Sequence, residues 1–190
     1  MSQPAISFLG VGLMGAPMVA RLLEAGFSLT LWNRTPAKAQ VFSGRARLAS
    51  SPAEAVAGAD VVITMLESGQ VVDQVLYQSG AIRQLRQGAL VIDMSSIEPG
   101  LARGHGAQVE ALGGGYLDAP VSGGTRGAQA GTLSIMAGGS DETFVRAAAV
   151  FQPLGTVTHI GPVGSGQLAK LANQAIVGIT IGAVSEALLL

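Results

Sequence analysis

The segment FLGVGLMGAPM, residues 8–18, constrains the fold of this chain more than any other. It carries Gly10, Gly12 and Gly15 in the spacing G-x-G-x-x-G, directly after the apolar run AISFL (residues 5–9), which is typical of a buried strand. The first glycine permits a tight turn from strand to helix, the second lets a phosphate approach the backbone, and the third lets the helix pack closely on the sheet. The pattern predicts a strand and helix whose junction binds a pyrophosphate.

Short β-branched runs alternate with Ala-rich helical stretches along most of the chain. This alternation predicts a doubly wound α/β fold of the Rossmann type, with a mainly parallel sheet covered by helices on both faces. Strands are expected at residues 5–9, 28–32, 60–66, 89–94, 115–119, 133–137 and 156–160. Helices are expected at residues 14–25, from Pro36, at 51–59, 70–77, 98–112 and 141–150, and from 167 to the end.

Composition excludes several classes of function. The chain has no cysteine, which excludes disulfides and thiolate chemistry, and with only His105 and His159 no metal site is expected. His105 is placed in an amphipathic surface helix and His159 in a strand, and neither is given a role. The net charge of −1, without a run of Lys or Arg, gives no basis for binding nucleic acid.

The termini bear on localisation. The N-terminus has no basic region before a long apolar run, so no signal peptide is predicted. The most apolar segment, residues 174–190, contains Ser185 and Glu186 and is shorter than a membrane span requires. We therefore expect a soluble, cytoplasmic protein with no membrane partner.

The end of the second predicted strand bears on the choice of cofactor. An NAD enzyme with this glycine loop would carry Asp or Glu there for the ribose hydroxyls, whereas this chain has Asn33, Arg34 and Thr35. A neutral Asn removes the carboxylate that would repel a 2′-phosphate, and the Arg34 guanidinium can pair with that phosphate. We predict NADP(H) as the preferred cofactor, with NAD(H) possible. The alternative is that Arg34 is an ordinary solvated surface charge.

Two further segments follow the glycine loop: DAPVSGGTRGAQAGTLSIMAGG (residues 118–139) and GPVGSGQLAKLAN (residues 161–173). With these three motifs the whole chain resembles the β-hydroxyacid dehydrogenase family, and VIDMSSIEP (residues 91–99) resembles its tartronate semialdehyde reductase branch. The resemblance implies hydride transfer between NADP(H) and a short β-hydroxy acid or semialdehyde. Tartronate semialdehyde (2-hydroxy-3-oxopropionate), reduced to glycerate, is the first choice of substrate, and the 3-hydroxyisobutyrate dehydrogenase reaction is the second.

The resemblance also assigns roles to residues. Lys170 would be the catalytic residue, because a carbonyl that receives hydride gathers negative charge on its oxygen and needs a proton donor. An ammonium partly desolvated in an apolar cleft has a lowered pKa and suits that task. Asn173, three residues later on the same helical face, would orient the substrate or the lysine. A lysine that merely extends from a helix end towards water is the alternative.

The other roles implied by the resemblance concern binding. A hydroxyl and free backbone N–H groups would bind the substrate carboxylate, and they belong to Ser122, Gly123 and Gly124. A plain glycine turn is the alternative there. The residues expected to contact the cofactor are Gly10, Val11, Gly12, Leu13, Met14, Gly15, Asn33, Arg34, Thr35, Met65, Leu66 and Ser96.

The resemblance further implies a division of the chain. Residues 1–163 would form the dinucleotide-binding domain with the carboxylate loop, and residues 164–190 would begin a long helix that leads, in family members, to an all-helical domain. That domain would complete the substrate cleft and much of the interface of a homo-oligomer, so this chain alone is expected to bind cofactor but turn over poorly.

Two other readings compete with this one. Imine reductases share the architecture and often an N-R-T strand end, but usually lack the lysine and the DAPVSGG segment, so Lys170 and Ser122 argue against them. A non-catalytic dinucleotide-binding module that serves interactions is the second alternative. The lysine, which such relatives replace, argues against it.

Overall fold

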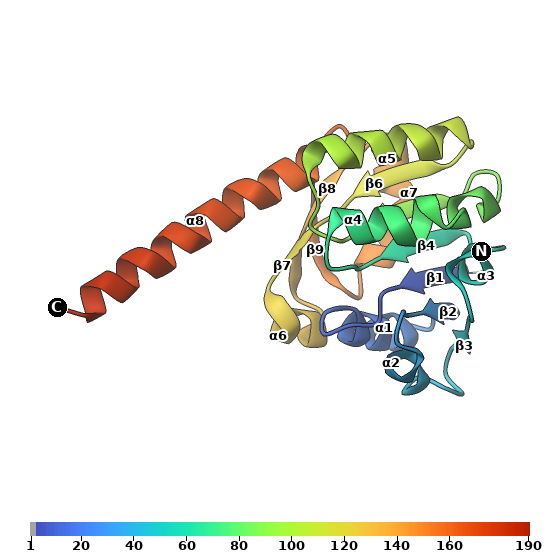
Figure 1. Ribbon diagram of the computed structural model, residues 1–190, viewed down its shortest axis with the longest axis horizontal. Helices are drawn as coiled ribbons and strands as arrows, with labels where there is room; N and C mark the ends of the chain where they lie inside the picture. The colour runs from blue at the N-terminus through green and yellow to red at the C-terminus, as the bar shows by residue number, and fades with distance from the viewer. Residues whose placement is uncertain (1–2) are drawn as a thin grey trace.

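The structure, a computed structural model, describes residues 3–190, and a nine-stranded sheet runs through them (Figure 1). The strand order is β3-β2-β1-β4-β5-β6-β8-β7, and β9 pairs with β8 outside this path. The strands are β1 (Ile6–Leu9), β2 (Leu29–Trp32), β3 (Arg47–Leu48), β4 (Val61–Thr64), β5 (Leu90–Asp93), β6 (Gly115–Asp118), β7 (Val121–Ser122), β8 (Leu133–Gly138) and β9 (Gly155–Gly161).

The six strands β3-β2-β1-β4-β5-β6 are all parallel to their neighbours. Their order is that of a Rossmann sheet, in which the chain reverses its direction of travel between β1 and β4. The carboxyl ends of β1, β2, β4 and β5 therefore meet at one edge, where ligands bind in open sheets of this type. The prediction of a doubly wound, mainly parallel α/β fold is confirmed.

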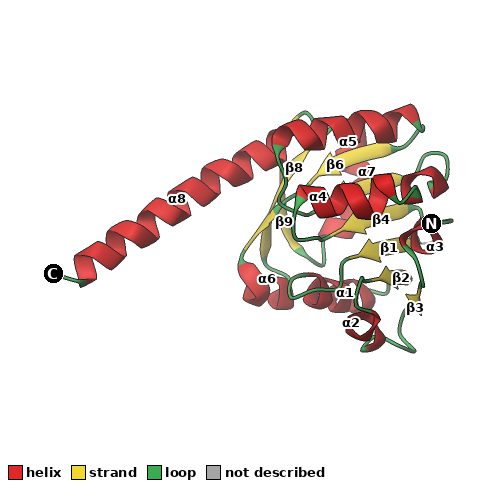
Figure 2. Cartoon of the chain, viewed as in Figure 1, coloured by secondary structure: helices red, strands yellow, loops and turns green. Residues whose placement is uncertain are grey.

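Helices cover both faces of the sheet (Figure 2). They are α1 (Gly15–Glu24), α2 (Pro36–Gln40), α3 (Pro52–Val56), α4 (Gly69–Val72), α5 (Pro99–Ala111), α6 (Gly124–Ala130), α7 (Asp141–Phe151) and α8 (Ser165–Leu188), with a π-helix at Asp73–Gln78 and a 3₁₀-helix at Ala81–Gln84. One hydrophobic core lies between the sheet and helices α1, α6 and α7, and a second lies between the sheet and helices α3 and α5.

The strands supply both cores because their side chains alternate between faces. In β4, Val61 and Ile63 belong to the first core, and Val62, between them, belongs to the second. All four residues of β4 are buried. This explains why the central strands are continuous apolar runs in the sequence, since both of their faces are covered.

The sheet changes character after β6. β6 and β8 are antiparallel and share the single residue pair Asp118↔Gly138, whereas β8 and β9 are parallel over most of their lengths. Four elements of the structure were not predicted from the sequence, namely β3, β7, α6 and the 3₁₀-helix. β3 and β7 contain two residues each, too few for a periodic pattern, and α6 contains two glycines, which disfavour a helix by intrinsic propensity.

The surface position expected for His105 is wrong. Its side chain is 1% exposed, its Nε2 lies 3.1 Å from Asp73 Oδ1, and its ring stacks on Tyr77 with centroids 4.1 Å apart. α5 lies beside the π-helix that carries Asp73 and Tyr77, so the imidazole is buried between these two elements. The amphipathicity of the helix alone could not show that a neighbouring helix covers this side chain.

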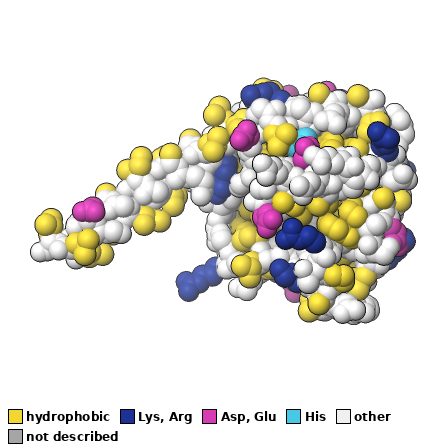
Figure 3. All heavy atoms as spheres, in the orientation of Figure 1, with side chains coloured by type: hydrophobic (Ala, Val, Ile, Leu, Met, Phe, Trp, Pro, Cys, Tyr) yellow, Lys and Arg dark blue, Asp and Glu magenta, His cyan; other side chains and the backbone are white. Residues whose placement is uncertain are grey.

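Helix α8 projects from the sheet as an arm (Figure 1), and hydrophobic side chains lie along its length (Figure 3). The exposed ones include Leu171, Ile176, Ile179, Val184 and Leu188. The helix has 24 residues and is long and apolar enough to cross a membrane by length and composition, because it extends beyond the segment 174–190 considered in the sequence. It begins at Ser165. Apolar helices covered by protein meet the same two criteria.

Candidate functional site

The glycine loop joins β1 to α1 and is held by contacts that only glycines allow. Gly10 has a φ of +108°, and a Cβ there would lie 2.2 Å from the carbonyl oxygen of Met65. A Cβ on Gly15 would lie 1.9 Å from the carbonyl oxygen of Gly10. A Cβ on Gly12, by contrast, would meet no atom within 4 Å. The first and third glycines therefore close the turn, and the second leaves its backbone open to a ligand.

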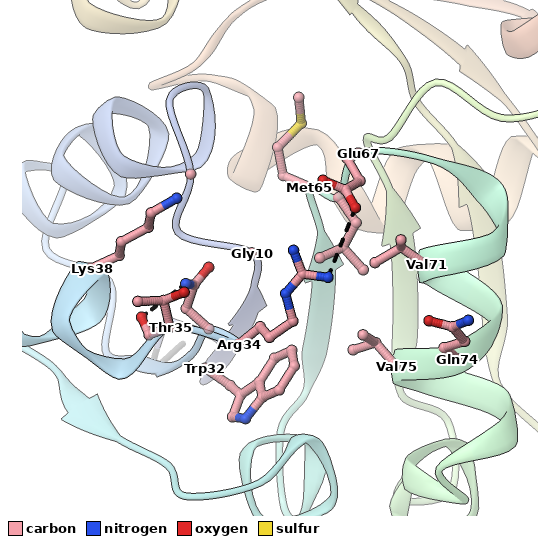
Figure 4. Close-up of a pocket in the computed structure, with 13 residues that line it drawn as sticks. Gly10, Trp32, Arg34, Thr35, Lys38, Met65, Glu67, Val71, Gln74 and Val75 are labelled. Atoms are coloured by element: carbon pink, nitrogen blue, oxygen red, sulfur yellow. Dashed lines mark hydrogen bonds and ion pairs between the residues drawn. The ribbon is translucent and has the colours of Figure 1, made fainter.

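A pocket of about 180 Å³ lies beside this loop (Figure 4). It is bounded by the ends of β1, β2 and β4 and by the helix that follows β4. Its lining residues are Gly10, Gly12, Trp32, Asn33, Arg34, Thr35, Lys38, Met65, Leu66, Glu67, Val71, Gln74 and Val75. We call it the loop pocket.

Seven of the predicted cofactor-binding residues lie together in the loop pocket: Gly10, Gly12, Asn33, Arg34, Thr35, Met65 and Leu66. Other predicted residues do not line it. Val11 and Gly15 are buried and Met14 packs against the core, so a ligand could meet these three mainly through their backbone, whereas the side chain of Leu13 is exposed.

The loop pocket contains side chains of both charges. Arg34 Nη1 lies 3.8 Å from Glu67 Oε1, as the dashed line in Figure 4 shows, and both side chains are mostly exposed. Lys38, on α2, is a second cation on the wall. Asn33 Nδ2 donates to the carbonyl oxygen of Thr35 at 2.9 Å, which fixes the turn after β2. Lys38 and Glu67 were not predicted, because neither belongs to a motif.

The loop pocket fits a dinucleotide. Its open backbone at Gly12 leaves room for a phosphate, and the cations Arg34 and Lys38 complement anionic groups. Val71 and Val75 offer apolar contact to a flat base.

A second pocket, of about 560 Å³, brings Lys170 and Ser96 together. Its lining residues are Ser68, Gly69, Gln70, Ser96, Ile97, Glu98, Leu101, Gln167, Lys170, Leu171 and Gln174. We call it the lysine pocket. Ser96 thus lies with the lysine and not in the loop pocket.

The ammonium of Lys170 is partly desolvated. Burial by the surrounding protein lowers the pKa of Lys170 below its usual value, because the charged form loses hydration. None of the ion pairs within residues 3–190 includes Lys170. Such an amine can give up a proton more readily than one on an open surface.

The structure does not bring every predicted substrate residue to the lysine pocket. Ser122, at the end of β7, and Gly123 and Gly124, at the start of α6, line neither pocket. Asn173 also lines neither, and its Nδ2 donates to Gln174 Oε1 at 3.3 Å.

Gln174 lines the lysine pocket in the place expected for Asn173. Each helical residue turns the chain by about 100°, so a residue four positions after Lys170 is about 40° off its direction and one three positions after is about 60° off. The sequence spacing alone could have raised Gln174 as a candidate beside Asn173.

Buried carboxylates hold the loops around the lysine pocket. Asp118, at the end of β6, accepts hydrogen bonds from the backbone N–H of Gly164 at 2.7 Å and of Gln167 at 2.8 Å. Burial raises the pKa of Asp118 to about 6, although these two bonds act to lower it. On the neighbouring strand β5, burial likewise raises the pKa of Asp93, which accepts from Thr64 Oγ1 at 2.8 Å and from the Ser95 N–H at 3.0 Å.

The two pockets are adjacent along the chain. Met65, Leu66, Glu67 and Val71 line the loop pocket, and residues 68–70, between them, line the lysine pocket. The start of α4 therefore separates a site for an anionic nucleotide from a site with a partly desolvated amine.

Comparison with known proteins agrees with this arrangement. Residues 5–161 match the NAD binding domain of 6-phosphogluconate dehydrogenase. The chain belongs to this family. The loop pocket lies within the residues that match this nicotinamide dinucleotide-binding domain.

Individual relatives are similar over nearly all of the chain. It is 40% identical over 186 residues to 2-hydroxy-3-oxopropionate reductase of Escherichia coli, covering 97% of this chain and 64% of the relative. It is 40% identical over 188 residues to NAD-dependent L-serine dehydrogenase of Pseudomonas aeruginosa, covering 97% and 63%. A structure of Mycobacterium tuberculosis 3-hydroxyisobutyrate dehydrogenase with L-serine superposes with a TM-score of 0.92 and 40% identity, covering 98% of this chain and 64% of that one. The chain thus spans less than two thirds of the length of these relatives.

The glycine loop yields a prediction about stability and binding. Gly15→Ala places a methyl group against the Gly10 carbonyl, so we expect the free energy of unfolding to fall by about 1–3 kcal/mol. Gly12→Ala is the matched variant, with a methyl group in open space, and should stay within about 0.5 kcal/mol of wild type while binding NADPH more weakly. Urea unfolding and titration of NADPH fluorescence measure both quantities. Wild-type NADPH affinity in Gly12→Ala would contradict this account of the loop.

Asp118 yields a prediction about pH. Its pKa is raised in the folded state, so the folded protein binds more protons than the unfolded chain between the two pKa values. The stability linked to Asp118 is complete below about pH 4 and is lost as the pH rises through about 6. We expect the difference in free energy of unfolding between wild type and Asp118→Asn to shift against wild type over this interval. Urea unfolding at a series of pH values tests it, and a difference that stays constant with pH would refute the raised pKa.

Proposed function

We propose that the protein is an oxidoreductase that transfers hydride between a nicotinamide dinucleotide and a short β-hydroxy acid or its semialdehyde. The observation that carries the proposal is the pairing of the two pockets. A partly desolvated amine, Lys170, lies in a pocket that adjoins the dinucleotide-binding loop pocket across the start of α4. This is the arrangement that a carbonyl reduction needs, a hydride carrier beside a proton donor.

Lys170 acts as general acid and base in this proposal. When bound, a nicotinamide donates hydride in reduction and accepts it in oxidation. In reduction the Nζ of Lys170 gives a proton to the carbonyl oxygen as it gains charge, and in oxidation the neutral amine takes the proton of the hydroxyl. The lowered pKa raises the fraction of neutral amine available for oxidation.

The substrate carboxylate is assigned to Ser122, Gly123 and Gly124, with Asn173 orienting the substrate or the lysine. The support for these roles is the resemblance of the DAPVSGG and KLAN segments to the family. These residues line neither pocket in residues 3–190, so the assignment implies that further protein completes the substrate cleft. The whole enzyme is also proposed to be a homo-oligomer, and the support is again the resemblance to the family.

Tartronate semialdehyde is the proposed substrate, reduced to glycerate, and 3-hydroxyisobutyrate is the second candidate. The first choice is supported by the 40% identity to 2-hydroxy-3-oxopropionate reductase of Escherichia coli, and the second by the similarity to 3-hydroxyisobutyrate dehydrogenase of Mycobacterium tuberculosis. Both candidates are small molecules with a hydroxyl or carbonyl group at which Lys170 can exchange a proton.

NADP(H) is the proposed cofactor, in preference to NAD(H). The support is that Asn33 and Arg34 stand at the end of β2 in the loop pocket, with Lys38 as a second cation. Glu67 opposes this preference, because its carboxylate lies 3.8 Å from Arg34 and competes with a 2′-phosphate for that guanidinium. The strength of the preference therefore depends on the balance between these charges.

Removal of the Lys170 amine tests the proposed reaction. We expect Lys170→Ala to slow the reduction of tartronate semialdehyde by at least about 100-fold, because the developing oxyanion loses its proton donor. Lys38→Ala removes the only other lysine and should weaken NADPH binding more than it slows the reaction. Single-turnover oxidation of NADPH, with the protein in excess, measures the rate even where steady turnover is slow. Full activity of Lys170→Ala would refute the mechanism.

Cofactor choice has its own test. We expect Arg34→Ala to reduce the preference for NADPH over NADH about tenfold, since a hydrogen-bonded ion pair with the 2′-phosphate is lost. Glu67→Gln, which removes the competing carboxylate and keeps the size of the side chain, should increase the same preference. The measurement is the ratio of the two dissociation constants. An unchanged ratio in Arg34→Ala would refute the assignment of NADP(H).

A further inference from the structure

We propose that Asp118 and Gln167 are positioning residues that fix the catalytic helix α8, and with it Lys170, against the loop that follows β5. The inference rests on the role of Lys170 in the proposed function. Both residues stand in segments quoted above, at the start of DAPVSGG and within GPVGSGQLAKLAN, but the sequence analysis gave neither a role. Neither is expected to touch the reacting atoms.

Asp118 replaces the missing N-cap of α8. The N-cap residue is Gly164, which has no side chain to accept the free N–H groups of the first turn. The Asp118 carboxylate accepts two of them, the Gly164 N–H with Oδ1 at 2.7 Å and the Gln167 N–H with Oδ2 at 2.8 Å. A negative charge at this end also complements the helix dipole. A residue 46 positions earlier in the chain thus determines where α8 begins.

The packing around the carboxylate leaves no freedom for the helix start. A Cβ on Gly166 would lie 2.3 Å from the Met136 carbonyl oxygen and 2.6 Å from that of Asp118. A Cβ on Gly138 would lie 2.5 Å from Asp118 Oδ1. The first turn of α8 therefore sits directly on the ends of β6 and β8, at a distance that only glycines permit.

Gln167 ties the same turn to the loop after β5. Its side chain is 1% exposed and uses both ends of its amide. Oε1 accepts from the Ile97 N–H at 3.0 Å, and Nε2 donates to the Ser95 carbonyl at 2.8 Å. Ser96, between these two residues, lines the lysine pocket with Lys170. Gln167 therefore holds one wall of that pocket to the helix that carries the amine.

Lys170 follows Gln167 by three residues, on a neighbouring part of the same helical face. The ion pairs within residues 3–190 leave Lys170 out, so its position depends on the backbone of α8. A displacement of about 1 Å at a reacting group can cost about 100-fold in rate. The buried network of Asp118 and Gln167 is the part of the structure that prevents such a displacement.

The position of the Lys170 amine can be tested directly, because the chain has only two lysines and their signals can be told apart. Reductive methylation with ¹³C-formaldehyde labels Lys38, Lys170 and the N-terminal amine, and NMR then follows the chemical shift and titration of each amine separately. In Asp118→Asn and Gln167→Met we expect the Lys170 signal to shift and its pKa to return towards the ordinary value, because the amine leaves its partly desolvated place. The Lys38 signal should not change.

The variants differ in what they remove. Gln167→Met keeps the size of the side chain and the Asp118 bonds but loses both amide contacts, so it decides the matter alone if Asp118→Asn fails to fold. Gln167→Glu keeps an acceptor for the Ile97 N–H and should restore part of the wild-type signal. Ser140→Ala is the matched control, because it removes the side-chain N-cap of α7, a helix without Lys170. It should lose stability without moving the Lys170 signal.

Rates provide the second readout. In the single-turnover assay we expect Gln167→Met to slow hydride transfer about tenfold or more, with the dissociation constant for NADPH unchanged, because the loop pocket draws on other elements. A folded Gln167→Met variant with a wild-type Lys170 signal overturns the proposal. Failure of the proposed function is a separate result: Lys170→Ala would then retain the wild-type rate, while the NMR signals still report whether Asp118 and Gln167 position the amine.

Discussion

The contact between the Asp118 carboxylate and the first turn of α8 is the interaction on which the rest of the site depends. Burying a carboxylate is unfavourable unless strong donors compensate it, and here the donors are two N–H groups that would otherwise lack partners. The raised pKa shows that burial outweighs these bonds. The Asp118 carboxylate is held in place in spite of this loss of hydration, and its two bonds fix the direction in which α8 leaves the sheet.

The two pockets use very few cations. Lys38 contributes to the loop pocket and Lys170 to the lysine pocket, and the chain contains no other lysine. Arg34 is shared between a possible ligand and Glu67. Few other charges lie in either pocket, so a misplaced cation could not be replaced by a neighbour. The position of each cation therefore determines what its pocket can bind. This is why backbone contacts at Gly10, Gly15 and Gly166 matter as much as the charges themselves.

Much of this architecture follows from the sequence. The continuous apolar strands predict the parallel sheet because both of their faces are buried, and the glycine spacing predicts the loop because only glycines fit its contacts. The short β7 and the glycine-containing α6 carry no such periodicity, and they add a strand and a helix between the predicted strands at residues 115–119 and 133–137. Gln167, Glu67 and the buried His105 depend on neighbours distant in sequence, which local patterns do not record.

The single pair between β6 and β8 has a mechanical consequence. One residue pair, Asp118↔Gly138, joins the parallel strands β1 to β6 to the group of β7, β8 and β9, so the sheet has a narrow joint there. The dinucleotide loop lies on one side of this joint, and β8 and β9 lie on the other. A joint of one residue pair resists bending less than a full ladder would. The first turn of α8 spans this joint: its N–H groups donate to Asp118 at the end of β6, and Gln167 bonds to residues 95 and 97 after β5, so a load applied to the exposed arm of α8 reaches the central strands through both side chains.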